Sequence, residues 1–198
     1  MNKARVESFS DGVFAFAITL LVLGVPIPDL VIVNDQQIRI GLVKSLHQLL
    51  PFITSFATIG IIWLNHHAMF HTVARVDHGA LILNLLLLLV VSFIPFPTAV
   101  LGRYGALPFS AFFYGCVLTA LGTTYSLLSF YILKSGLRRD ETPDGSSWDR
   151  LRNALGAAIY PIATVLSLRH PRVGVTIYFL LAAFYLLPAK SFAINRAV

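Results

Sequence analysis

The sequence predicts an all-α integral membrane protein whose single domain spans residues 1–198. Hydrophobic residues make up 57% of the chain, and charged residues make up only 12%. Soluble domains of this size carry about 25% charged residues, so this chain has too few polar side chains to cover a globule in water. Lipid is the simplest solvent that fits this composition. We therefore expect transmembrane helices, without a soluble domain or an internal repeat.

Six segments are long and apolar enough to cross the hydrocarbon core of a bilayer, which takes about 20 mostly apolar residues. They are residues 8–25, 46–70, 80–101, 107–133, 151–168 and 173–187. The first segment is expected to stop at Pro26, because proline cannot continue a helix. A polar connection leads into the second segment, where Pro51 can introduce a kink.

Prolines and polar residues also shape the later segments. The third contains the unbroken apolar run 85–91, and Pro95 and Pro97 end or kink it. The fourth is followed by the longest polar stretch, residues 134–152, which we interpret as a solvated turn. The fifth is the least apolar, because Asn153 and several small residues dilute it, and the sixth follows it after a short basic turn.

The positive charges of the loops predict the orientation of the chain. Of the 15 Lys and Arg residues, ten lie on the side of the two termini and five on the other side. Since cytoplasmic loops carry the excess of Lys and Arg, we expect both termini in the cytoplasm. Anionic lipid headgroups account for the net charge of +6. The basic residues lie between apolar runs, so we expect no nucleic-acid partner.

The first segment carries most of the functional information, because its faces differ. An α-helix turns about 100° per residue, so positions around the helix can be assigned from the sequence. The residues within about 60° of Phe16 on that rule are Gly12, Thr19, Leu20 and Leu23. Asp11 lies about 140° away from Phe16 by the same rule. One face is therefore an apolar stripe with a single hydroxyl, and another face carries the acid.

Both faces also have ordinary explanations. An apolar stripe on a membrane helix often contacts lipid or a neighbouring helix. A carboxylate near a helix end can reach the headgroups, although an intramembrane Asp costs about 2.5–3.5 kcal/mol and normally faces protein or water. Periodicity alone therefore predicts a polar anchor at Asp11 and a candidate lining stripe around Phe16, but no channel.

A motif in the first segment adds a resemblance to a known family. Arg5-x-x-x-Phe9-Ser10-Asp11, followed by Gly-Val-Phe-Ala-Phe-Ala-Ile-Thr-Leu-Leu-Val-Leu, resembles the signature of the transmembrane protein 175 family. The members of that family are endosomal and lysosomal potassium channels and their prokaryotic relatives. The motif is long and is rarely assembled by chance.

Two later features extend the resemblance over nearly the whole chain. Trp63-x-x-x-His67, at the end of the second segment, is similar to the family pattern. So is Asn84, followed by a leucine-rich third segment. A single six-helix unit resembles the prokaryotic members, which implies a homotetramer in the prokaryotic plasma membrane. The implied partners are further copies of the chain, membrane lipids and monovalent cations.

The resemblance also implies roles for individual residues. Four copies of the first helix would line a central pore, with constrictions at Phe16, Leu20 and Leu23 and a hydroxyl at Thr19. The apolar stripe contains these same positions. Most family members carry an aliphatic residue, often Ile, where this chain has Phe16. The residues implied to anchor the first helix are Arg5, Phe9, Ser10 and Asp11, and their implied partners are Trp63, His67 and Asn84.

We therefore predict a potassium-permeable cation channel with a hydrophobic gate, since a narrow apolar collar excludes water and so excludes ions. The chain has no TVGYG filter, so we expect Thr19 hydroxyls and the pore dimensions to supply a modest potassium preference. Apart from permeant K⁺, no cofactor is expected. The alternatives are a proton or non-selective leak channel on the same scaffold, a small secondary transporter, and a membrane scaffold without transport.

The histidines at the end of the second segment have several possible roles. His67 and His71 are spaced i, i+4, which suits a metal when a third ligand converges. They could instead respond to pH, or form a polar helix end that packs on the first helix, which we favour. The sequence shows no nucleophile–base pair and no paired catalytic carboxylates, so we expect neither an enzyme nor a metal site.

Overall fold

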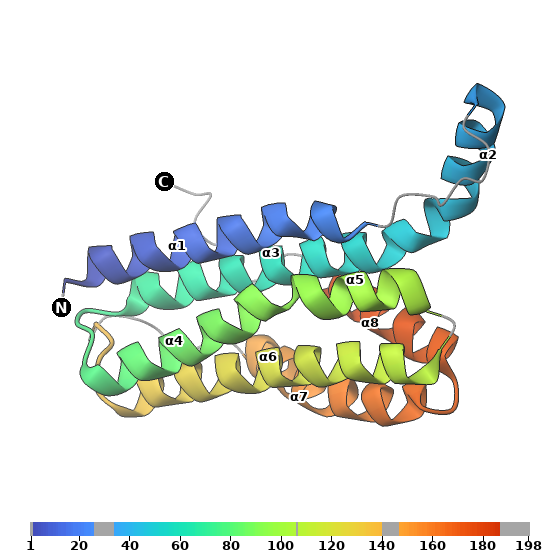
Figure 1. Ribbon diagram of the computed structural model, residues 1–198. Coiled ribbons are helices and arrows are strands. Elements are labelled where there is room, and N and C mark those ends of the chain that lie inside the picture. Colours follow the sequence, from blue (N-terminus) through green and yellow to red (C-terminus); the bar gives the residue numbers. More distant parts are fainter. Residues whose placement is uncertain (1, 26–33, 106, 140–146, 187–198) are drawn as a thin grey trace, which may run out of the picture.

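The computed structural model describes residues 2–25, 34–105, 107–139 and 147–186, without the side chains of residues 44, 47 and 147–154. The described part is helical, apart from one isolated bridge between Val73 and Arg138. Its α-helices are α1 (Lys3–Leu20), α2 (Asp35–Ser45), α3 (Leu49–Thr72), α4 (His78–Phe93), α5 (Pro95–Tyr104), α6 (Pro108–Lys134), α7 (Ser147–Ser167) and α8 (Pro171–Leu186). All except α2 form one elongated bundle, from which α2 projects at one end (Figure 1).

Helix α1 begins at Lys3, five residues before the expected start of the first segment. The Asn2 side chain caps it by accepting a hydrogen bond from the Ala4 N–H at 3.1 Å, and Lys3 and Glu7 form an ion pair one turn apart at 3.7 Å. Hydropathy detects only apolar residues, so it misses this first turn, whose charged residues are helical but not apolar. The helix tightens into a 3₁₀ turn, η1 (Leu21–Gly24), and the expected stop at Pro26 lies outside the described residues.

Helix α2 lies in the stretch that the sequence predicted as a polar connection. Asn34 begins it, with a side-chain oxygen that accepts from the Gln37 N–H at 2.8 Å, and Asp35 lies in its first turn. Both features stabilise the positive end of a helix. A 3₁₀ turn, η2 (Leu46–Gln48), joins α2 to α3. Pro51 falls in the first turn of α3, where proline is tolerated, so it need not kink that helix.

Among the residues that the structure describes, four segments are long and apolar enough to cross a membrane, namely Lys3–Gly24, Leu49–Thr72, His78–Tyr104 and Pro108–Lys134. The third of these combines α4 and α5, which are interrupted at Ile94, just before Pro95. Two further described helices, α7 and α8, hold shorter apolar stretches, Leu155–Ser167 and Pro171–Leu186. Of the polar turn expected over residues 134–152, the structure describes 134–139 and the start of α7.

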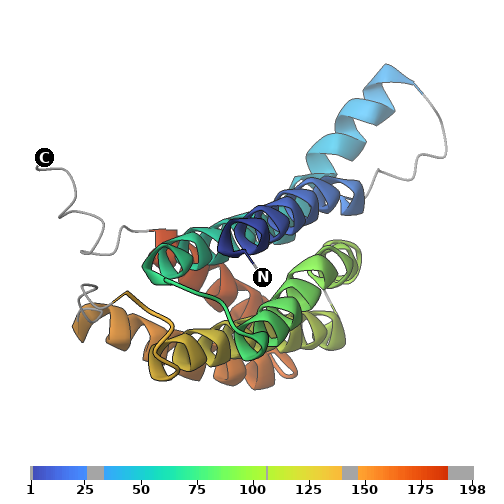
Figure 2. The same ribbon diagram turned by 90° about the vertical axis from the view of Figure 1, so that its left-hand side faces the viewer.

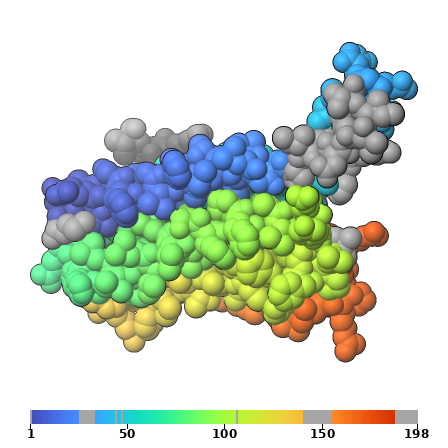
Figure 3. Space-filling model, viewed as in Figure 1, coloured from blue at the N-terminus to red at the C-terminus, as the bar shows by residue number. Residues whose placement is uncertain are grey.

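Helix α1 lies on the outside of the bundle, where it packs against α3 and α4 (Figures 1 and 2). In the space-filling view it runs along the surface beside α4 and α5 (Figure 3). One core cluster joins α1, α3, α4 and α6 around residues such as Phe14 and Leu87. A second cluster joins α5, α6, α7 and α8 around Tyr114 and Tyr178. One face of α1 is thus buried in the core, and the opposite face is left free.

The turns at one end of the bundle are joined by hydrogen bonds. The N–H of Ala74 donates to the Leu137 carbonyl at 2.8 Å, and that of Arg139 donates to the Thr72 carbonyl at 3.0 Å. Asp77 caps α4 by accepting from the Ala80 N–H at 2.8 Å. Its other oxygen accepts from the Tyr131 hydroxyl of α6, also at 2.8 Å. Both bonds lower the pKa of Asp77, and the bond from the Ala80 N–H has the larger effect.

We expect acid to weaken the fold through Asp77. The pKa of its carboxyl is lower in the folded chain than in the unfolded one, where it is about 4. The ionised carboxylate therefore stabilises the fold fully above about pH 4, and this contribution is lost as the pH falls below that value. Asp77→Asn keeps an oxygen that caps the helix but cannot titrate. Thermal unfolding in detergent should therefore show a smaller loss of stability below about pH 4 in this variant. Equal losses in both proteins would contradict the prediction.

Candidate functional site

A buried chain of hydrogen bonds ties α1 to α3 and α4. The Asn84 amide of α4 donates to the Ser10 hydroxyl of α1 at 3.0 Å, and Ser10 donates to the Val6 carbonyl at 2.8 Å. On its other side, the Asn84 Oδ1 lies 2.8 Å from Nε2 of His66. Because this oxygen can only accept, Nε2 of His66 is the donor. The chain therefore has one direction, from His66 through Asn84 and Ser10 to Val6.

The three side chains of this chain are almost inaccessible, with exposed fractions of 1% for His66, 2% for Asn84 and 0% for Ser10. The His66 ring stacks on Phe70 at a centroid distance of 4.4 Å and tilts toward Phe14 of α1 at 5.4 Å. A buried polar group that loses its partner costs about 1–3 kcal/mol. The network therefore fixes how α1 is rotated against its neighbours.

A second polar contact lies one residue further along α1. The indole N–H of Trp63 donates to Oδ1 of Asp11 at 2.8 Å. Asp11 is partly buried, and Trp63 is 37% exposed, so this bond lies near the edge of the α1–α3 contact. Asp11 thus faces a protein partner, in a position where its charge is partly solvated.

The structure brings together only part of the set that the resemblance implied. Ser10 and Asp11 contact Asn84 and Trp63, respectively. The hydrogen bond to Asn84 comes from His66 and not from His67, so the partner role implied for His67 stays a prediction. The His67 ring is exposed and lies beside Trp63, at a centroid distance of 6.1 Å. Both histidines lie within about one turn of Trp63, so spacing alone does not distinguish them.

Arg5 and Phe9 are the anchor residues that the structure leaves outside these contacts. Both are exposed on α1, and Phe9 has an exposed fraction of 56%. Among the residues that the structure describes, neither side chain forms a hydrogen bond or an ion pair. Within one chain they belong to the free face of α1 rather than to its anchored face.

The apolar stripe expected on α1 coincides with that free face. Phe16 is 67% exposed and Leu23 is 79% exposed, while Thr19 is exposed and Leu20 is partly buried. The residues that face the core instead are Val6, Ser10, Phe14, Ala17 and Leu21. Of the three large apolar side chains of the stripe, Phe16 and Leu23 are therefore the more exposed, and Leu20 lies closer to its own bundle.

The Thr19 hydroxyl has a defined orientation within this stripe. It donates its hydrogen to the Phe16 carbonyl at 2.8 Å. Its oxygen lone pairs therefore remain available to accept from water or to coordinate a cation. A single oxygen ligand on an otherwise apolar face can contact an ion, but it cannot enclose one. Several copies of the helix would have to converge to form a cage.

Comparisons with known proteins reveal related ion channels. The family model described as endosomal/lysosomal potassium channel TMEM175 matches residues 5–95. A potassium channel from Chamaesiphon minutus is 38% identical over 96% of this chain and 96% of its own length. The human endosomal/lysosomal proton channel TMEM175 is 28% identical over 84% of this chain and 35% of its own length.

The similarity extends to a solved structure. The crystal structure of a lysosomal potassium-selective channel TMEM175 homolog from Chamaesiphon minutus superposes with a TM-score of 0.79 and 34% identity. The match covers 93% of this chain and 96% of that chain.

The bond between Asp11 and Trp63 can be tested with a double-mutant cycle. We expect Asp11→Ala and Trp63→Phe to be coupled by about 1.5 kcal/mol, the low end for hydrogen bonds to charged groups, because Trp63 is 37% exposed. Unfolding free energies in mixed micelles give this coupling energy. Asp11→Ala should also weaken assembly more than it changes ion selectivity.

Glu7→Ala is the matched control for this cycle. It removes an acid of the same helix whose surface ion pair with Lys3 is 3.7 Å long, so it should change stability by no more than about 0.5 kcal/mol. If Asp11→Ala gave stable assemblies with altered ion selectivity, Asp11 would face the ions rather than anchor the helix.

Proposed function

We propose that this chain, which belongs to the family of the endosomal/lysosomal potassium channel TMEM175, forms a potassium-permeable cation channel lined by α1. The observation that carries the proposal is the division of α1 into two faces. One face is held in the bundle by Ser10 and Asp11. The other presents Phe16, Thr19 and Leu23 to the outside of the chain.

Self-association explains what the free face of α1 is for. Closed oligomers place the same surface of every copy around one axis. In a homotetramer with α1 at the centre, four copies of the stripe would enclose a conduit and be removed from lipid. The polar contacts of Ser10 and Asp11 support this arrangement, because they fix the same rotation of α1 in every copy.

The side chains of the stripe suit a hydrophobic gate. Rings of Phe16, Leu20 and Leu23 would form narrow apolar collars, from which water and hydrated ions are excluded until the ring widens. Phe16 and Leu23 are the more exposed of these three side chains within one chain, so they would form the narrowest collars. Leu20, which is partly buried, contributes a wider one.

Between Phe16 and Leu23, the Thr19 hydroxyl is the only side-chain oxygen on the stripe. Its donated bond to the Phe16 carbonyl turns the lone pairs outward. Four such hydroxyls around an axis would offer partial coordination to a cation that has shed some of its water. That is weaker than a carbonyl cage, and it gives a modest preference for K⁺ over the more strongly hydrated Na⁺.

The runner-up function is proton conduction, which the name of the human relative suggests. We favour monovalent metal cations, because Phe16, Thr19, Leu20 and Leu23 include no group that titrates near neutral pH. The relatives that match over nearly their whole length are named potassium channels. Reversal potentials measured in separate K⁺, Na⁺ and pH gradients would distinguish the two functions.

The membrane topology follows the loop charges. We propose six spans, with α7 and α8 joining the four long apolar segments, and with both termini in the cytoplasm because that side carries the excess of Lys and Arg. The relative from Chamaesiphon minutus matches this chain over 96% of its length, which supports a single-unit channel in a prokaryotic plasma membrane.

We expect Leu20→Asn to raise potassium flux into liposomes by about tenfold or more, which corresponds to lowering the barrier by about 1.4 kcal/mol. Four amides in an apolar collar would hydrate it and relieve the exclusion of ions. Leu127→Asn is the matched control, because Leu127 is 50% exposed on α6, which is not the lining helix. Equal flux in the two variants would show that Leu20 is not part of a gate.

We expect Thr19→Val to bring the K⁺/Na⁺ permeability ratio closer to unity. Valine keeps nearly the same shape but removes the oxygen whose lone pairs face outward. Reversal potentials across planar bilayers under bi-ionic conditions measure this ratio directly. An unchanged ratio would remove Thr19 from the selectivity mechanism, whatever its effect on conductance.

A further inference from the structure

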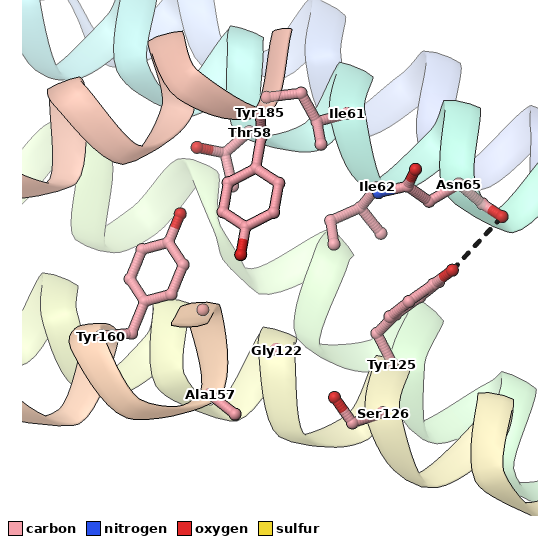
Figure 4. A pocket seen from close by; sticks show the side chains of 11 residues that line it. Thr58, Ile61, Ile62, Asn65, Gly122, Tyr125, Ser126, Ala157, Tyr160 and Tyr185 are labelled. Atoms are coloured by element: carbon pink, nitrogen blue, oxygen red, sulfur yellow. Dashed lines mark hydrogen bonds between the residues drawn. The ribbon is translucent and has the colours of Figure 1, made fainter. Parts of the chain in front are cut away.

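A cavity of about 70 Å³ lies inside the bundle, away from α1 (Figure 4). Its walls come from α3, α6, α7 and α8, and its lining is mostly apolar. Ser126 and Ala157, two of the lining residues, are exposed on the outside of the bundle. The cavity is therefore only partly enclosed, and a molecule dissolved in the lipid can enter it from the side.

Two glycines shape this cavity. At Gly122 of α6 no heavy atom lies within 4 Å of the position that a Cβ would occupy. A larger side chain would fit there, so glycine keeps room that the helix itself does not need. At Gly156 of α7 a Cβ would collide with the Tyr185 hydroxyl. Glycine there lets Tyr185 lie close against α7 and form one wall (Figure 4).

Polar groups accompany the apolar walls. The hydroxyls of Ser126 and Tyr160 and the Asn65 amide donate to no protein group among the residues that the structure describes. The Tyr125 hydroxyl makes only a long bond to the Asn65 carbonyl, at 3.4 Å. The Ser126, Tyr160 and Asn65 groups line the cavity or its opening without a protein partner among the described residues, so they can exchange hydrogen bonds with a guest molecule.

The dimensions and the lining define the chemical class of the guest. One water needs about 10–15 Å³ of such space, so 70 Å³ accommodates about five to seven non-hydrogen atoms. No Asp, Glu, Lys, Arg or His lines the cavity among the described side chains, and an unpaired ion would be very costly there. The guest is therefore small, uncharged and amphiphilic.

We propose that this cavity binds a small aliphatic alcohol, with about four carbons, that enters from the lipid. Its hydroxyl exchanges hydrogen bonds with Tyr160, Ser126 or Asn65, and its carbon chain fills the space beside Gly122. A ligand of this size binds weakly, with half-saturation at about millimolar concentration. The proposal is independent of ion conduction, because the site lies in the bundle of one chain.

The test uses the purified full-length protein in nanodiscs and a butanol analogue that carries a photoreactive diazirine. Irradiation with about 1 mM analogue should label α6 and α7 near Tyr125 and Tyr160, and mass spectrometry locates the labels. A twentyfold excess of 1-butanol should lower this labelling by about tenfold, by mass action. Labelling that excess 1-butanol does not displace would overturn the proposal and indicate that acyl chains occupy the cavity.

Substitutions provide an independent arm of the same experiment. Gly122→Leu fills the cavity and should lower labelling by about tenfold. Thr123→Leu, the matched control, adds an apolar side chain to the next residue, which is exposed and does not line the cavity, and should leave labelling unchanged. If Gly122→Leu did not fold, Ile62→Phe, at a partly buried lining residue, would fill the cavity from α3. Full labelling in a folded, filled variant would contradict the proposal.

Discussion

The rotation of α1 depends on two polar contacts, because apolar packing alone cannot set it in lipid. Acyl chains attract an apolar helix face about as well as another helix does, so association needs close packing or hydrogen bonds. Ser10 and Asp11 supply those bonds, to Asn84 and Trp63. They occupy successive positions of α1 and reach two different helices, so together they allow only one rotation. The outward position of Phe16 and Thr19 follows from it.

Hydrogen bonds between side chains and close contacts at small residues also join other helices of the bundle. The Ser55 hydroxyl of α3 lies 2.7 Å from that of Thr98 on α5 and 2.8 Å from that of Tyr114 on α6. This one group therefore aligns three helices. At the end of η1, a Cβ at Gly24 would lie 2.9 Å from the Cβ of Ala99. Glycine is thus needed for that close approach to α5, so small and polar residues mark the junctions of the helices.

The sequence predicted helices well where hydropathy determines their position. It predicted them less well where individual side-chain contacts determine the structure. Long apolar runs locate α3 and α6 within a few residues, because crossing a membrane demands length and apolarity together. Helix α2 was missed, because its cap at Asn34 is a local hydrogen bond in a polar stretch. His66 was missed because His66 and His67 are adjacent residues within about one turn of Trp63, and only the position of Asn84 distinguishes them.

In a pore lined by α1, the anchors would limit how such a gate can open. The polar contacts of α1 lie at Ser10 and Asp11, whereas Phe16 lies further along the helix and Leu23 lies in the 3₁₀ turn η1. Rotating the whole helix would break bonds at buried partners, each at a cost of about 1–3 kcal/mol. Tilting the part beyond the anchors keeps those bonds. It would displace Leu23 more than Phe16, since displacement grows with distance from the fixed end. In such a pore, widening at Leu23 would spare the bonds of Ser10 and Asp11 but would disturb the packing of Gly24 against Ala99, and the Phe16 collar, nearer the anchors, would move less.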